Sequence, residues 1–101
     1  MNEERNTDEI MVGDIKIARS VLEKMVRESV SAVDGISGLK RADVEPEAEG
    51  LKIALHVNLH HKYVYPEVAA AVQKKVADDI NRMTGIESFT VDVTVDKLDF
   101  T

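Results

Sequence analysis

The sequence contains no cysteine and no tryptophan, and it has only two phenylalanines, two tyrosines and two prolines among 101 residues. The absence of cysteine excludes disulfide bonds, thiolate metal sites and cysteine nucleophiles, and it fits a reducing compartment. Because aromatic residues are scarce, Val, Ile, Leu, Met and Ala must build the core. For the same reason, few rings are available on which nucleic-acid bases could stack.

Long hydrophobic runs are also missing. The longest one extends from Val68 to Val72, whereas a membrane-spanning helix needs about 20 consecutive apolar residues. The start of the chain, from Met1 to Glu9, is acidic and lacks the apolar stretch of a secretory signal. We therefore expect a cytoplasmic protein without direct membrane insertion, whose association with any membrane would be indirect.

Basic runs do not exceed the pairs Lys40-Arg41 and Lys74-Lys75, and the formal net charge is −6. Such a charge repels a phosphate backbone and argues against nucleic acid as a partner. An apolar share of 44% with 32% charged residues is typical of a folded chain, and the length suits one core. We expect a charged flexible tail over residues 1–11 and a single domain over residues 12–101.

Two segments place apolar residues at helical spacing. The first runs from Ala18 to Val33 and is followed by Gly35, and the second begins at Pro66 and is followed by Gly85. Glycine has no Cβ and can therefore adopt the left-handed backbone that ends a helix. The expected buried stripes are Ala18, Val21, Leu22, Met25, Val26, Val30 and Val33 in the first helix, and Val68, Val72, Val76, Ile80 and Met83 in the second.

Other segments alternate between apolar and polar residues, which is the pattern of a half-buried strand. The clearest run extends from Leu51 to His60, and another extends from Phe89 to Asp96. Ala42 to Glu45 is a weaker segment that we expect to pair with the first run as a hairpin, although Pro46 limits it to an edge or a bulge. Asp14 to Ile17 also alternates and would form a short strand.

These elements predict an α+β fold, a two-layer sandwich in which two helices cover one face of a small mixed sheet. The order is helix, strand, strand, helix, strand, with a short extra strand fitting at the N-terminus. The other face of the sheet would be polar and open, and it is our candidate interaction face, with plain solvation as the alternative. Its residues are Lys52, His56, Asn58, His60, Thr90, Asp92, Thr94 and Asp96.

The histidines do not predict a metal site. His56 and His60 would lie roughly 13 Å apart along a strand, and His60 and His61 would point to opposite faces. Zinc needs its ligands about 2 Å from a common centre. Asp92 and Asp96 are also roughly 13 Å apart, too far for shared acid-base work. We therefore predict no cofactor, no metal and no catalytic residue.

Two alternatives to a binding or assembly role stay open. Gly35-Ile36-Ser37-Gly38 matches the G-x-x-G loop of KH-type RNA-binding domains, although here it joins a helix to a strand and follows an aspartate. An enzyme whose site forms only in three dimensions is the other alternative, and it would need a deep pocket with convergent polar groups. Asp78 and Asp79, on the second helix, are expected on a solvated face.

Four segments, taken in their order along the chain, resemble a known family. They are Gly13-Asp14-Ile15-Lys16-Ile17-Ala18, Val33-Asp34-Gly35-Ile36, Pro66-Glu67-Val68-Ala69 and Met83-Thr84-Gly85-Ile86. From Gly13 to about Val95 the chain closely resembles the alkaline shock protein family of bacterial envelope stress response proteins. One departure is Lys62-Tyr63-Val64-Tyr65, which stands where relatives often have a glycine, so this loop should be shaped differently.

The resemblance implies a cytoplasmic protein that works by assembly, as a scaffold, and not by catalysis. Some relatives gather at the membrane through a separate transmembrane partner, so the resemblance implies recruitment to the inner face of the membrane by a membrane-anchored protein. Our leading hypothesis adds that the protein self-associates. The resemblance brings no catalytic residue and no cofactor.

Overall fold

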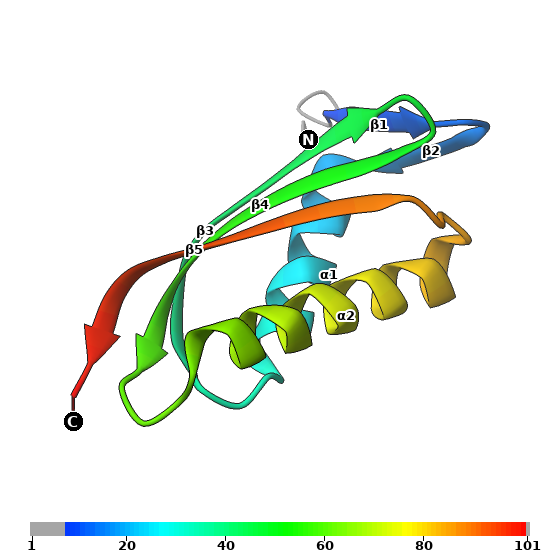
Figure 1. The fold of residues 1–101 in the computed structure, drawn as a ribbon. Coiled ribbons are helices and arrows are strands. Elements are labelled where there is room, and N and C mark those ends of the chain that lie inside the picture. Colours follow the sequence, from blue (N-terminus) through cyan, green and yellow to red (C-terminus); the bar gives the residue numbers. More distant parts are fainter. Residues whose placement is uncertain (1–7, 101) are drawn as a thin grey trace.

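The computed structural model describes residues 8–100. Along the chain these form β1 (Glu9–Val12), β2 (Ile15–Ala18), α1 (Arg19–Ser31), β3 (Ile36–Glu47), β4 (Gly50–His60), α2 (Tyr65–Thr84) and β5 (Phe89–Asp99), as Figure 1 shows. The predicted α+β class and the order helix, strand, strand, helix, strand are confirmed.

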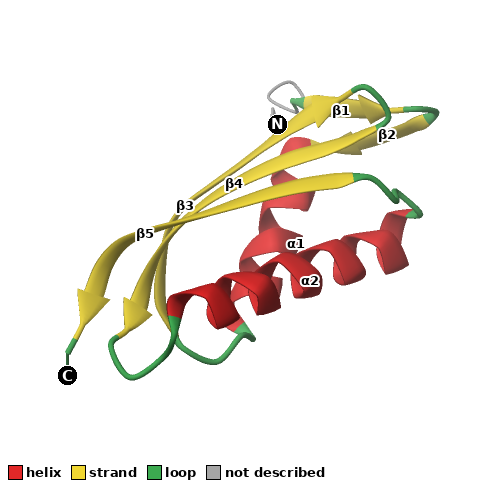
Figure 2. Cartoon of the chain, viewed as in Figure 1, coloured by secondary structure: helices red, strands yellow, loops and turns green. Residues whose placement is uncertain are grey.

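The main sheet has the strand order β3-β4-β5. β3 and β4 are antiparallel, whereas β4 and β5 are parallel, so the sheet is mixed as predicted. The chain reaches the parallel position of β5 by crossing over through α2, as parallel neighbours require. Both helices lie on the same face of this sheet (Figure 2).

The core is built on β4, the central strand. Its alternating residues turn toward the helices and are at most 1% exposed: Leu51, Ile53, Leu55, Val57 and Leu59. The corresponding residues of β5 pack against this core but are only partly buried, and they are Phe89, Val91, Val93 and Val95. The helices therefore cover the centre of the sheet more completely than its β5 side.

Each helix buries fewer side chains than the spacing of its apolar residues predicts. α1 buries Leu22, Val26, Ser29 and Val30, and α2 buries Val68, Val72, Val76 and Ile80. The predictions for Val21 and Met83 are wrong, because these side chains are 47% and 68% exposed. Helical spacing fixes the side of a helix on which a residue lies, but it does not say whether another element covers that turn.

The N-terminal part of the domain starts earlier than the boundary expected at residue 12. Glu9–Val12 pairs with Ile15–Ala18 as an antiparallel hairpin, and Ile10 is 1% exposed. The hairpin is held to the start of α1 by the backbone N–H of Arg19, which donates to the carbonyl of Asp8 at 2.7 Å. The remainder of the predicted tail, residues 1–7, lies outside the described residues.

Gly85 is the C-cap of α2, but the prediction that Gly35 ends the first helix is wrong: α1 ends at Ser31 with Ala32 as its C-cap, and the chain passes through a turn before it reaches Gly35. Both glycines have a left-handed backbone, with φ angles of 98° at Gly35 and 83° at Gly85. The N–H of Gly85 donates to the carbonyl of Asn81 at 2.7 Å, which satisfies one of the last carbonyls of α2. Beyond Gly35 the chain enters β3 directly, so that this strand is longer than the predicted segment from Ala42 to Glu45.

Candidate functional site

The predicted interaction face exists as one surface of the main sheet. Lys52 lies opposite Thr90, and His56 lies opposite Thr94, in the parallel pairing of β4 with β5. These side chains project from the face opposite the one on which the buried residues of β4 meet the helices. The structure therefore brings the predicted residues together, while their role in binding stays a prediction.

One cross-strand contact organises the middle of this face. The Nδ1 atom of His56 lies 3.0 Å from Oδ1 of Asp96. A bulge between Val57 and Asn58 shifts the pairing with β5, so that Asn58 lies opposite Lys97. Both partners of the contact remain accessible, with side chains 38% and 40% exposed. The carboxylate therefore binds the imidazole directly.

Small and charged residues alternate around this contact. Ala54 lies between Asp43 on β3 and Asp92 on β5, and Lys52 lies opposite Glu45. Ala54 therefore places a short methyl side chain among charged neighbours, and these charges have both signs. The surface is thus of mixed polarity.

The histidines at the end of β4 are arranged differently from the prediction. The strand ends at His60, so His61 lies in the following turn and the two rings stack, with centroids 5.2 Å apart. The ring of His61 also stacks on Phe100 at 4.8 Å. The prediction that His60 and His61 point to opposite faces is wrong because strand alternation stops at His60. Within residues 8–100, no three histidine or carboxylate side chains gather closely enough to hold a metal ion.

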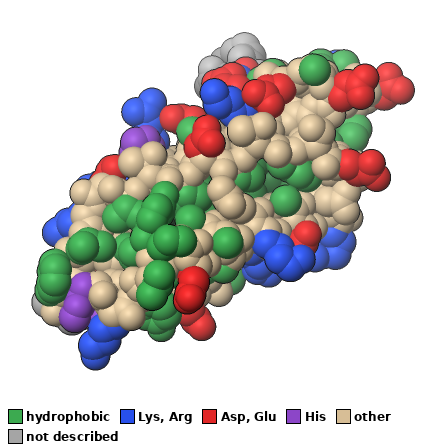
Figure 3. All heavy atoms as spheres, in the orientation of Figure 1, with side chains coloured by type: hydrophobic (Ala, Val, Ile, Leu, Met, Phe, Trp, Pro, Cys, Tyr) green, Lys and Arg blue, Asp and Glu red, His purple; other side chains and the backbone are tan. Residues whose placement is uncertain are grey.

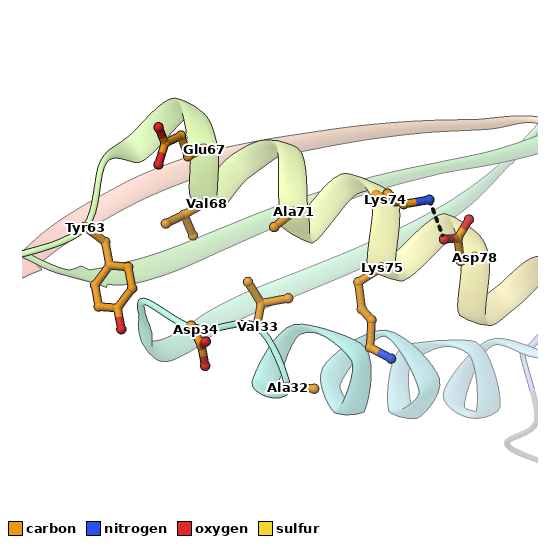
Figure 4. Close-up of a pocket in the computed structure, with 10 residues that line it drawn as sticks. All are labelled: Ala32, Val33, Asp34, Tyr63, Glu67, Val68, Ala71, Lys74, Lys75 and Asp78. Atoms are coloured by element: carbon orange, nitrogen blue, oxygen red, sulfur yellow. Dashed lines mark hydrogen bonds and ion pairs between the residues drawn. The ribbon is translucent and has the colours of Figure 1, made fainter.

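A groove lies between the end of α1 and the first half of α2 (Figure 4), with a volume of about 490 Å³. Val33, Val68 and Ala71 supply apolar lining, and the ring of Tyr63 stands at one end. Farther along α2, Nζ of Lys74 donates a hydrogen bond of 3.0 Å to Oδ2 of Asp78. Sequence reasoning missed this groove because separate segments with ordinary helical patterns build it.

Asp79 was expected on a solvated face, but its side chain is only 15% exposed. The Oγ of Ser29 donates to Oδ2 of Asp79 at 2.6 Å, and Lys75 and Arg82 bind the same carboxylate at 3.3 and 3.1 Å. The hydrogen bond from Ser29 lowers the pKa of Asp79 below its ordinary value, against the opposing effect of burial, and Lys75 and Arg82 lower it further. This cluster joins the two helices.

The fold and its surfaces define a class of protein: a small α+β domain with an open sheet face, on which polar residues pair with one another. None of the helices in residues 8–100 is long and apolar enough to cross a membrane. The sequence model of the alkaline shock protein family, a family with a cell envelope-related function, matches residues 42–100. This is more than half of the chain, and the chain belongs to that family.

Several solved structures share the fold. A manganese form of a MamM CTD variant superposes with a TM-score of 0.62 at 16% identity, covering 77% of this chain and 96% of that chain. A nickel form gives 0.61 at 13% identity over 77% and 96% of the two chains. A cadmium form gives 0.63 at 16% identity over 77% and 94%. At these identities the likeness concerns the fold alone, and no curated protein matches the sequence.

Proposed function

We propose that this protein is a non-enzymatic scaffold of the bacterial cell envelope, located on the cytoplasmic side and recruited to the membrane by a protein partner. It self-associates or docks through the outer face of the main sheet, the face formed by Lys52, His56, Asn58, His60, Thr90, Asp92, Thr94 and Asp96. Membership of a family with a cell envelope-related function supports the setting.

The proposal rests on the observation that the helices cover only one face of the main sheet. α1 and α2 lie on the same face (Figure 2), and the other face of the three strands is left without a helix. The main pockets in the described residues are not lined by the side chains of this face, which suits a broad protein contact better than the enclosure of a small substrate. Plain solvation of this open sheet face is the alternative that the experiment must exclude.

Neither of the other functions considered from the sequence gains support. Gly35 and Gly38 flank the start of β3, and Gly38 pairs opposite Asn58 within the sheet, whereas a KH loop connects two helices. The interhelical groove has apolar side chains at its centre, and two of the charged residues that line it, Lys74 and Lys75, are bound to Asp78 and Asp79 of the same helix. An active site would instead require polar groups that converge on a substrate.

Replacement of Ala54 by Arg tests the proposal. A guanidinium at this position has Asp92 on one side and Asp43, which already binds Arg41 at 2.8 Å, on the other, so the thermal stability should stay close to that of the wild type. The long side chain would nevertheless obstruct a partner that lies flat on the face. We expect Ala54→Arg to lower the weight-average mass in light scattering over a concentration series, and to reduce the recovery of native partners in a pull-down.

The matched control is Ala70→Arg, which makes the same substitution at an exposed position of α2 on the helix side. It should leave both association and partner recovery as in the wild type. A wild type that stays monomeric throughout, together with an Ala54→Arg variant that recovers the same partners, would refute the proposal.

A further inference from the structure

The two edges of the main sheet differ in how well they resist the addition of another strand. β3, at one edge, has irregular pairing between Ile36 and Gly38 and between Leu39 and Arg41, and it carries Pro46 near its end. Bulges and proline are features that block edge pairing. β5, at the other edge, has a bulge at Asp96, but from Phe89 to Val95 it pairs regularly with β4, contains no proline or glycine, and alternates Val with Thr and Asp. A regular edge segment of this kind is a template for pairing with other chains.

The free edge of β5 can be assigned from one backbone hydrogen bond. The carbonyl of Ser88 accepts from the N–H of Leu51 on β4 at 3.0 Å. Backbone groups of successive strand residues point to alternate sides. Thr90 and Asp92 therefore direct their backbone groups toward β4, whereas Val91 and Val93 direct theirs toward the open side.

Two side chains of α2 donate to these outward carbonyls. The Nε2 atom of Gln73 donates to the carbonyl of Val91 at 2.9 Å, and the hydroxyl of Tyr65 donates to the carbonyl of Val93 at 2.8 Å. These are the acceptors that the N–H groups of an added strand would use. The side-chain donors of Tyr65 and Gln73 thus occupy the positions that the backbone N–H groups of an added strand would take.

The surface beside these bonds would otherwise favour strand addition. Val91, Val93 and Val95 are only partly buried on the helix side of β5. In Figure 3, hydrophobic side chains gather over the C-terminal half of β5 and the start of α2. An added strand would cover this apolar surface, so the hydrophobic effect would favour pairing once the carbonyls were released.

We propose that Tyr65 and Gln73 close the edge of β5 to strand addition, so that this domain meets its partners through faces and not by extending its sheet. The closure acts by competition, because a new strand must first displace two hydrogen bonds made within the domain. It is independent of whether the outer face binds a partner, and the two proposals can fail separately.

The test compares Tyr65→Phe/Gln73→Ala with the wild type, in the Ala54→Arg background that removes association through the outer face. Both side chains are exposed, so the core and the melting transition should be preserved. Loss of two competing hydrogen bonds should raise the self-association constant by roughly tenfold to a hundredfold in light scattering. The backbone N–H groups of Val91 and Val93 should exchange quickly with deuterium in the parent and slowly in the associated variant.

Tyr63→Phe/Lys74→Ala is the matched control, because it removes one tyrosine hydroxyl and one long polar side chain at exposed positions nearby, and it should associate no more than the parent. The single variants Tyr65→Phe and Gln73→Ala should give intermediate association, and either one tests the proposal if the double variant unfolds. Equal association of the double variant and the control would overturn the proposal. Increased association with fast exchange at Val91 and Val93 would also overturn it, because the contact would lie elsewhere.

Discussion

Ser29 on α1 donates a hydrogen bond of 2.6 Å from its Oγ to Oδ2 of Asp79 on α2. Ser29 is 3% exposed and is the one buried polar residue among the described residues. Lys75 and Arg82 also bind Asp79, at 3.3 and 3.1 Å. The two helices are therefore joined by a charged acceptor with three donors, in addition to their apolar contacts.

Replacing Ser29 by Ala should destabilise the domain. The variant loses a hydrogen bond to an ionised acceptor in a poorly solvated place, with an expected loss of about 1–3 kcal/mol in the free energy of unfolding. Urea denaturation followed by circular dichroism measures this. Ser31→Ala is the control, because the hydroxyl of Ser31 is exposed and binds only within its own helix. Coincident urea midpoints for Ser29→Ala and wild type would show that the contact is not stabilising.

The contribution of Asp79 should depend on pH. Its pKa in the folded state lies below its ordinary value, chiefly because Ser29 donates to the carboxylate. A lowered folded pKa gives a stabilisation that is complete above the unfolded pKa, about 3.9 for aspartate, and is lost as the pH falls through the folded value. The difference in unfolding free energy between wild type and Asp79→Asn should therefore be constant between about pH 5 and pH 7 and shrink below about pH 4.

Urea denaturation at several pH values measures this difference. Asp78→Asn provides the control, because Asp78 is 56% exposed and has a surface pairing with Lys74, which is worth little. A difference for Asp79→Asn that stays constant down to the lowest pH would show that ionisation of Asp79 does not stabilise the fold.

The Asp79 cluster also shows where sequence reasoning ends. Alternation from Leu51 to His60 was sufficient to predict a strand, and its outward residues do form one face. The contact of Ser29 with Asp79 could not be predicted, because it depends on how α1 crosses α2 and not on the pattern of either helix. The partners are 50 positions apart in the chain, and both residue types are ordinary on a solvated helix.

The first strand was missed for a different reason. Ile10 and Val12 alternate over only four residues of β1, within a stretch whose charge suggests a tail. Their burial is decided by pairing with β2, which turns back at Gly13 with φ at 58°. Likewise, the pairing of His56 with Asp96 required the bulge after Val57, and a bulge leaves no clear signal in one sequence.

Replacing Gly85 by Val should cost about 1–3 kcal/mol of unfolding free energy, because the backbone at φ 83° is strained for a β-branched residue. A Cβ at this position meets no atom within 4 Å, so the cost comes from the backbone alone. Gly85→Asn should recover part of the loss, since asparagine tolerates the left-handed conformation. Denaturant midpoints that are equal for Gly85→Val and wild type would show that the helix-end assignment is wrong.

Zinc should not raise the melting temperature. His56 is bound to Asp96, and His61 stacks on Phe100; no group of three such ligands is found in residues 8–100. A ligand that binds the folded state in a specific site raises its stability in a saturable way. Thermal melts with increasing zinc measure this, and a saturable rise that disappears in His56→Ala would contradict the prediction.

Gly35 should tolerate substitution less well than Gly85, because two separate penalties coincide there. Its φ is 98°, and a Cβ would lie 2.8 Å from Cγ of Tyr63 and 3.0 Å from Cγ2 of Val68. Gly35→Ala should therefore cost about 1–3 kcal/mol for the backbone and a further amount for displacing the Tyr63 ring. Because Tyr63 is 45% exposed, its removal should relieve the part of the steric penalty that is due to its ring, without opening a core cavity, whereas the close approach to Val68 remains.

A double-mutant cycle of Gly35→Ala with Tyr63→Ala separates the two penalties. The coupling energy should be favourable by about 0.5–1.5 kcal/mol, since the pair is in contact, while the backbone cost remains in the double variant. Gly85→Ala with Tyr63→Ala is the matched cycle, and there the effects should add, because Gly85 has no neighbour for a Cβ. Additive effects in both cycles would show that the Tyr63 ring, drawn at one end of the groove in Figure 4, does not pack against Gly35 in solution.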